Sequence, residues 1–209
     1  MPQVLKDDIK NRILHVAVDM FKNYGYAKTS MKNIATEAKV AVGNLYRYFN
    51  SKEDLYNEII KEFVDKVNNI IKENTHNMVN LEDMEEDVYD LVGKLEDYPN
   101  YLGVYPMVSK ICYDLSEYIN KNRDKAIIFF QSSKEVPSSR LNLIEIIQKV
   151  LYGKIKKDMN KTYLEDEDKL YACSLAKGFY ETLSYMVINM EESFDMADLM
   201  NKVVKLYFL

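Results

Sequence analysis

The stretch KVAVGNLYRYFNSKEDL, Lys39 to Leu55, concentrates aromatic rings and charge in very few positions. At about 100° per residue, a helix over Val42–Phe49 centres Leu45 and Phe49 on one face, with Val42 and Tyr46 flanking them. The opposite face then carries Gly43, Asn44, Arg47 and Tyr48. An ordinary surface helix would place Lys and Glu on that face. This face instead carries groups that can contact a partner, namely a bare backbone, an amide, a guanidinium and a phenol.

The residues around this helix predict further helices on both sides. Apolar residues at helical spacing indicate a first helix from Ile9 to Phe21 with Gly25 at its C-terminus, and a short second helix from Met31 to Ala38 capped by Thr29 or Ser30. A fourth helix is expected to begin after Ser51 and to run to about Lys72, with Glu53 and Asp54 near its positive dipole end.

A second and a third helix joined by a three-residue turn are typical of the helix-turn-helix, whose second helix enters the DNA major groove. Asn44 and Arg47 can make the paired hydrogen bonds that read adenine and guanine edges, and Gly43 permits close backbone approach. Phosphate contacts are expected from the hydroxyls of Thr29, Ser30 and Tyr48 and from the charge of Lys52. Packing of YRYF against a neighbouring helix is the alternative, but four consecutive residues span most of a helix circumference and cannot share one interface.

Charge is distributed unevenly along the 209 residues, whose net charge is -5. Residues 1–52 carry a net +5 and residues 53–209 therefore a net -10. A basic head on an acidic body suits a protein with a polyanionic partner at one end, although chance clustering would give the same numbers.

Several classes of protein are disfavoured by composition. With 47% hydrophobic and 29% charged residues the chain is typical of soluble globular proteins. The charged N-terminal segment is not a signal peptide, and no run of about 18 apolar residues occurs, so a cytoplasmic protein without membrane contact is expected. Cys112 and Cys173 lie far apart with no CxxC, which predicts free thiols, no metal site and no cofactor.

The segment TSMKNIATEAKVAVGNLYRYFNSKEDL, Thr29 to Leu55, resembles the N-terminal signature of the TetR family of bacterial transcriptional regulators, roughly T-[ST]-x-x-x-I-A-x-x-A-G-V-S-x-G-x-L-Y-x-Y-F-x-[ST]-K-E-x-L. The preceding helix with its glycine-aromatic end is also similar. Lys39 replaces the usual turn glycine, which would cost about 1 kcal/mol if the backbone needs a positive φ there. Ala41 replaces the usual serine, so a cap of about 1 kcal/mol is missing.

The resemblance implies an all-α protein with two domains. Residues 1–52 would form a three-helix helix-turn-helix DNA-binding domain, and residues 53–209 a larger helical ligand-binding and dimerisation domain. The expected DNA-binding residues are Thr29, Ser30, Lys39, Val42, Gly43, Asn44, Tyr46, Arg47, Tyr48 and Lys52. Periodicity predicts further helices near 81–96, 100–117, 121–133, 139–160, 166–190 and 195–208, with a break at Asn77–Asn80.

The helix from Asp166 to Asn189 has apolar residues on more than one face, so it should be buried on two sides. A homodimer interface is expected on this helix and on the one from Asp195 to Phe208, with a plain intramolecular core as the alternative. The interface residues predicted are Ala172, Ala176, Phe179 and Leu183.

Tyrosines are abundant beyond residue 80 and suggest a pocket for a small apolar or aromatic ligand, although helical cores also use tyrosine freely. The predicted lining residues are Tyr89, Tyr105, Tyr113 and Phe129. Acidic neighbours such as Asp90 or Glu117 could instead select a cationic ligand, but a solvated acidic face explains them equally well, so the ligand class stays open.

No arrangement of His, Cys, Ser and carboxylates suggests an active site, and no phosphate-binding loop or HExxH is present, so an enzyme is not expected. The sequence predicts a regulator that binds a palindromic double-stranded DNA operator as a dimer and is released by a small molecule, most simply a repressor. The alternative is a helical small-molecule-binding protein or enzyme that retains an unused helix-turn-helix.

Overall fold

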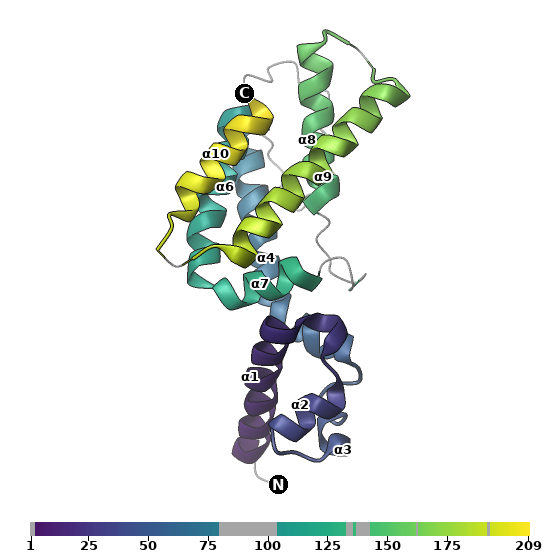
Figure 1. Cartoon of the computed structure of the whole chain (residues 1–209), viewed down its shortest axis with the longest axis vertical. Coiled ribbons are helices and arrows are strands. Elements are labelled where there is room, and N and C mark those ends of the chain that lie inside the picture. The colour runs from purple at the N-terminus through teal and green to yellow at the C-terminus, as the bar shows by residue number, and fades with distance from the viewer. Residues whose placement is uncertain (1–2, 80–103, 133–135, 137–142, 162, 192) are drawn as a thin grey trace. The chain divides into compact units, whose positions relative to one another are not determined.

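The computed structural model describes residues 3–79, 104–132, 136, 143–161, 163–191 and 193–209, and every regular element within these ranges is an α-helix (Figure 1). The helices are α1 (Gln3–Lys28), α2 (Met31–Glu37), α3 (Val42–Leu45), α4 (Lys52–Val79), α6 (Val104–Lys121), α7 (Arg123–Ser132), α8 (Leu143–Asp158), α9 (Asp166–Asn189) and α10 (Met196–Phe208). The predicted all-α class is confirmed. The helix predicted near 81–96, with its Tyr89, lies outside the described residues.

The chain divides into two compact units, Met1–Val64 with Asn122–Arg140, and Asp65–Lys121 with Leu141–Leu209. The first unit holds α1, α2, α3, the beginning of α4, and α7. Each helix of this unit contributes fully buried apolar side chains to its core. These include Ile13, Ala17, Phe21, Ile34, Ala35, Leu45, Leu55, Tyr56, Ala126 and Ile128.

Gly25 turns the chain at the end of α1 toward α2. Its φ of 77° and ψ of 166° lie outside helical space, so α1 is interrupted there although helical turns continue to Lys28. Only glycine adopts this conformation without strain. The predicted helix end at Gly25 therefore corresponds to a real kink.

The second unit is built from helix pairs, with α6 packed against α10, and α9 packed against both α8 and α10 (Figure 1). Gly178 on α9 allows the Tyr207 ring of α10 to pass close by, since a Cβ placed there would lie 2.9 Å from the Tyr207 Oη. Phe179 adds edge-to-face contacts, with 5.3 Å between its ring centroid and that of Tyr207 and again that of Phe208.

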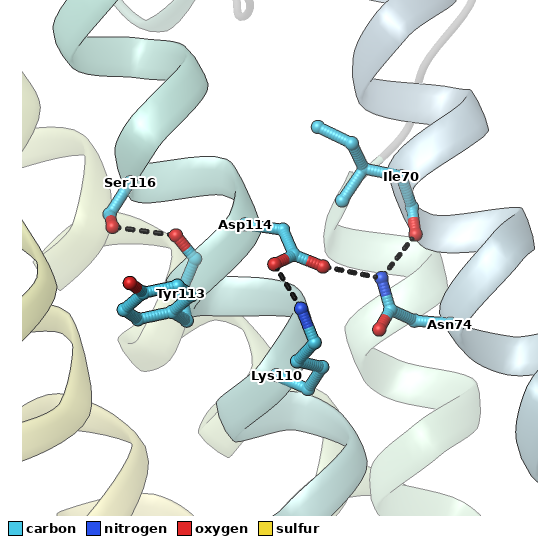
Figure 2. Close-up of polar contacts among 6 residues, drawn as sticks. All are labelled: Ile70, Asn74, Lys110, Tyr113, Asp114 and Ser116. Carbon is cyan, nitrogen blue, oxygen red and sulfur yellow. Dashed lines mark hydrogen bonds and ion pairs between the residues drawn. The ribbon is translucent and has the colours of Figure 1, made fainter.

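Two predicted helix boundaries were wrong. The expected break at Asn77–Asn80 does not interrupt α4 before Val79. The side chains of Asn74 and Thr75 donate hydrogen bonds to the carbonyls of Ile70 and Ile71, so these two polar residues lie within the helix. Figure 2 shows the hydrogen bond from Asn74 to Ile70. The third helix was predicted to reach Phe49, but α3 ends at Leu45 and continues as tighter turns.

Candidate nucleic-acid interface

The turn between α2 and α3 is fixed by backbone geometry. Lys39 has a φ of 54°, and its N–H bonds to the Thr36 carbonyl at 3.1 Å while that of Val40 bonds to the Ala35 carbonyl at 2.9 Å. The left-handed conformation explains why glycine is usual at this position. The backbone does need a positive φ at Lys39, which was the condition for the predicted strain. The lysine side chain is exposed.

The start of each helix in this region shows which caps the sequence supplies. The Ser30 hydroxyl accepts a hydrogen bond from the Asn33 N–H at 3.1 Å, which makes Ser30 rather than Thr29 the N-cap of α2. Ala41 precedes α3 with no side-chain cap, as its sequence predicted. The Ser51 hydroxyl accepts from the Asp54 N–H at 3.0 Å at the start of α4.

The two faces of the α3 region separate as predicted. Leu45 is fully buried and Phe49 is 3% exposed, so both anchor the segment on the core. The Tyr48 N–H bonds to the Leu45 carbonyl at 3.0 Å, which carries the chain on in a tight turn after α3 ends. The face away from the core presents exposed Gly43 and Arg47 with half-buried Asn44 and Tyr48.

Val42 and Tyr46 do not join the core side. They are 38% and 49% exposed. Tyr46 lies beyond the end of α3 at Leu45, where the chain no longer advances at 100° per residue, whereas Val42 is the first residue of the helix. Their exposure leaves both side chains accessible to a partner. A Cβ at Gly43 would meet nothing within 4 Å, so its lack of a side chain does not serve packing within the protein.

Thr29 and Lys52 make contacts within the protein. The Thr29 side chain is 1% exposed and its hydroxyl donates to the Gly25 carbonyl at 2.8 Å, so that hydroxyl does not face solvent. Lys52 Nζ donates to the carbonyls of Tyr26 at 2.8 Å and Thr29 at 3.0 Å, and lies 4.0 Å from the Tyr26 ring centroid. Lys52 thus joins the first turn of α4 to the segment between α1 and α2.

Four basic side chains, Lys28, Lys32, Lys39 and Arg47, are exposed and form no ion pair within the described residues. By contrast, Lys10 pairs with Glu58 and Lys22 with Asp124, each at 2.5 Å. Lys28 and Lys32 were absent from the predicted DNA-binding set. The only indication of these two lysines in the sequence was the excess of positive charge in residues 1–52, to which both contribute.

The three predicted ligand residues that the structure describes are divided between the two compact units. Tyr105 and Tyr113 both lie on α6, where the Tyr105 hydroxyl donates to Asn201 Oδ1 at 3.5 Å. Tyr113 is 52% exposed and lines an open cleft of about 340 Å³ with Ser109 of α6 and residues of α10. Phe129 belongs to the other compact unit and is buried there, 5.7 Å from Phe63 between ring centroids.

The predicted dimer residues lie inside the single chain. Ala172 and Ala176 are fully buried, Phe179 is 3% exposed and Leu183 is 8% exposed, because α8 and α10 cover this side of α9. These four side chains follow the intramolecular alternative. The exposed apolar side chains of α9 are Leu170, Tyr171 and Tyr185, and Leu206 is exposed on α10.

No metal site is evident in the parts of the chain described. No three His, Cys, Asp or Glu residues there are grouped so that they could hold a metal ion. Cys112 and Cys173 are free, and burial raises the pKa of the Cys112 thiol to about 12. Across the same residues, no helix is both long and apolar enough to span a membrane.

A helix-turn-helix DNA-binding protein is defined by three features that are present here. They are a tight turn between two short helices, buried anchors on one side of the second helix, and polar and basic groups on its other side. The family model for bacterial regulatory proteins of the tetR family matches residues 13–59, which cover this whole arrangement. The chain belongs to the TetR family of transcriptional regulators.

Curated relatives are similar in sequence to this chain, and solved structures share its fold. IcaR of Staphylococcus aureus, a negative transcriptional regulator of the biofilm operon icaADBC, is 22% identical over 147 residues, covering 66% of this chain and 78% of its own. A TetR-family regulator from Bordetella parapertussis superposes with a TM-score of 0.59 at 18% identity, covering 99% of this chain and 95% of the other. FadR of Bacillus subtilis, solved with stearoyl-CoA, gives 0.52 at 19% identity over 94% and 96% of the two chains.

Proposed function

We propose that this protein is a transcriptional repressor that binds a pseudo-palindromic operator as a homodimer and is released by a small molecule. The observation that carries the proposal is the α3 region, where Leu45 and Phe49 are buried while Gly43 and Arg47 face solvent. IcaR is by name a negative regulator, which supports repression. Residues 1–52 are proposed as the DNA-binding domain and residues 53–209 as the ligand-binding and dimerisation domain, acting on DNA in the cytoplasm.

Base reading is assigned to Asn44 and Arg47, close approach to Gly43, and phosphate contact to exposed groups around them. Ser30 keeps its hydroxyl proton available for a phosphate, since it accepts rather than donates in capping α2. Lys39 is exposed beside the turn and adds positive charge. For Thr29, whose hydroxyl is buried, any phosphate contact would come from its backbone.

A second copy of the chain is proposed to cover the exposed apolar side chains of α9 and α10, namely Leu170, Tyr171, Tyr185 and Leu206. One short recognition segment reads too few base pairs for useful specificity, so two related by a two-fold axis are needed. Tyr185→Asp should give a folded monomer with weakened operator binding, whereas Phe179→Asp, at a buried position, should impair folding. A wild type that sediments as a monomer at micromolar concentration would refute the dimer.

The ligand is proposed to be small and apolar, aromatic or amphipathic, acting through α6 and its Tyr105 and Tyr113. The Bacillus subtilis FadR structure with stearoyl-CoA makes long-chain acyl-CoA a sensible first compound to test. Tyr113→Ala should raise the concentration needed for release without changing ligand-free DNA affinity. An unchanged response in both Tyr105→Ala and Tyr113→Ala would place the pocket elsewhere.

The direct test of the proposal is a mobility shift on the DNA upstream of the protein's own gene, followed by footprinting. We expect one protected pseudo-palindrome and loss of the specific complex in Arg47→Ala. Equal affinity for this DNA and for a shuffled fragment at physiological salt would refute the proposed function.

A further inference from the structure

The recognition segment, residues 41–49, begins with three exposed residues that have no polar side-chain atom, Ala41, Val42 and Gly43. Ala41 is the N-cap of α3 and Val42 is its first residue, and neither can donate or accept a hydrogen bond through its side chain. The first side chain of the segment that can do so belongs to Asn44. The start of the recognition segment is therefore apolar where it faces solvent.

Val42 contributes less to the core than the two anchors of the segment. It is 38% exposed, whereas Leu45 is fully buried and Phe49 is 3% exposed. Valine does not favour the helix either, because a β-branched side chain loses rotamer freedom there. Neither packing nor helix formation accounts for an exposed valine at this position, and its isopropyl group lies where a partner can reach it.

The place of Val42 in the motif limits what that partner can be. In a helix-turn-helix, the N-terminal residues of the second helix contact base edges in the major groove. These edges carry hydrogen-bond donors and acceptors, and thymine alone adds a methyl group, at C5. A valine pressed against a donor or an acceptor displaces water without replacing the hydrogen bond, which costs free energy. Against the thymine methyl group it buries apolar surface on both partners.

We propose that Val42 is a specificity-determining residue whose isopropyl group contacts the C5 methyl group of a thymine, one in each half-site of the operator. The inference rests on the proposed function and deepens it, because it names a base that the protein recognises by apolar contact rather than by hydrogen bonds. Valine is stiff at χ1, so little rotamer freedom is lost when the contact forms. Tyr46 is also exposed, but its phenol can bond to a phosphate oxygen, so its exposure does not require an apolar partner.

Removal of single methyl groups from the DNA tests the contact. In the footprinted operator, each thymine is replaced in turn by deoxyuridine, which lacks the C5 methyl group and keeps every hydrogen-bonding group of the base pair. For the wild type, replacement at one position in each half-site should weaken binding about fourfold, the factor that corresponds to one buried methyl group. Replacement at the other thymines should change affinity by less than about 1.5-fold.

Val42→Ala shows whether Val42 is the residue that contacts this methyl group. The variant should bind the thymine operator at least about fourfold more weakly than the wild type, and it should lose less than about 1.5-fold more when the same thymine becomes deoxyuridine. Lys32→Ala is the matched control, because Lys32 is exposed on α2 and carries charge rather than apolar surface. It should weaken binding overall and keep the fourfold loss on deoxyuridine. Each purified protein is checked for helical content before affinities are compared.

A second change in the DNA separates the methyl group from the rest of the base pair. Cytosine and 5-methylcytosine, placed in turn at the position of the sensitive thymine with guanine opposite, differ only in the C5 methyl group. The wild type should bind the methylated operator about fourfold more tightly than the unmethylated one, and Val42→Ala should bind the two within about 1.5-fold. Affinities are measured at an ionic strength low enough for both complexes to form.

The outcomes separate the inference from the function it rests on. A loss below about 1.5-fold for deoxyuridine at every thymine would overturn the inference, while specific binding and the proposed function stand. An equal loss on deoxyuridine in the wild type and in Val42→Ala would also overturn it, because the methyl group would then contact another residue. A wild type that protects no specific site would refute the proposed function and the inference with it.

Discussion

The helix-turn-helix segment (the head) and the C-terminal helices (the body) differ in how far along the sequence the contacts lie that decide the role of a residue. In the first, Lys39 takes a positive φ and Ser30 caps α2, and both properties follow from hydrogen bonds between residues a few positions apart. In the second, Ala176 is buried because α9 meets helices that are distant in sequence. Local rules therefore identify side-chain roles in the head, whereas in the body they identify helices but not what each face contacts.

The largest expected effect tests whether the head depends on its buried anchors. Leu45→Ala should lower the free energy of unfolding by about 2 to 5 kcal/mol, because it removes a fully buried side chain from a small core. Val42→Ala is the control, since Val42 lies in the same helix and is 38% exposed. Urea denaturation measures both, and similar losses for the two variants would show that α3 is not held by its buried face.

A smaller effect should separate base reading from general attraction to DNA. Arg47→Ala should cost about 1 to 3 kcal/mol on the operator and relax preference at particular base pairs, whereas Lys32→Ala should weaken all sequences alike and lower the salt slope by roughly one. Lys52→Ala is less suitable as the phosphate variant, because Lys52 also holds the Tyr26 and Thr29 carbonyls. Equal losses on operator and shuffled DNA for Arg47→Ala would remove it from base reading.

These contrasts show what could be predicted from sequence and why. The class of fold, the turn, the anchors and the exposed polar face of the recognition segment follow from periodicity and from the resemblance. The end of α3 at Leu45 and the inward hydroxyl of Thr29 do not, since both depend on where tight turns replace α-helical bonds.

In the C-terminal helices, apolar residues on more than one face of α9 correctly predicted its contacts on two sides, with α8 and α10, but not that both partners belong to the same chain. Phe179 contacts Tyr207 and Phe208 of the same chain, which only the placement of α10 reveals. The spacing of apolar residues predicts how much of a helix surface is buried. It does not tell whether that surface is covered by another helix of the same chain or by a second copy of the protein. The hydrogen bond that the Asn74 amide of α4 donates to Asp114 of α6 (Figure 2) was not predicted either, because the two residues are far apart in sequence.

A still smaller effect compares two non-glycine residues with positive φ among the described residues, one in each region. Lys39→Gly should stabilise the protein by about 0.5 to 1 kcal/mol, since relief of the strain at φ 54° exceeds the entropy that glycine adds to the unfolded chain. Asn160→Gly, at φ 52°, should give less, because asparagine tolerates this conformation better than lysine. Thermal denaturation of the two variants side by side measures the difference, and a larger gain at Asn160 would contradict the strain argument.

The smallest expected effect lies in the body and depends on a contact that no sequence pattern indicates. Gly178→Ala gains about 0.5 to 1 kcal/mol of helix propensity but brings a Cβ to 2.9 Å from the Tyr207 Oη, so the two effects should nearly cancel. In a Tyr207→Phe background the close oxygen is absent and the next ring atom lies at 3.5 Å, so Gly178→Ala should there stabilise by the full propensity gain. Urea denaturation of the four proteins gives the coupling between the two sites. A loss above about 2 kcal/mol in both backgrounds would mean that α9 and α10 cross too closely for any side chain at this position, and that the glycine rather than the tyrosine sets their approach.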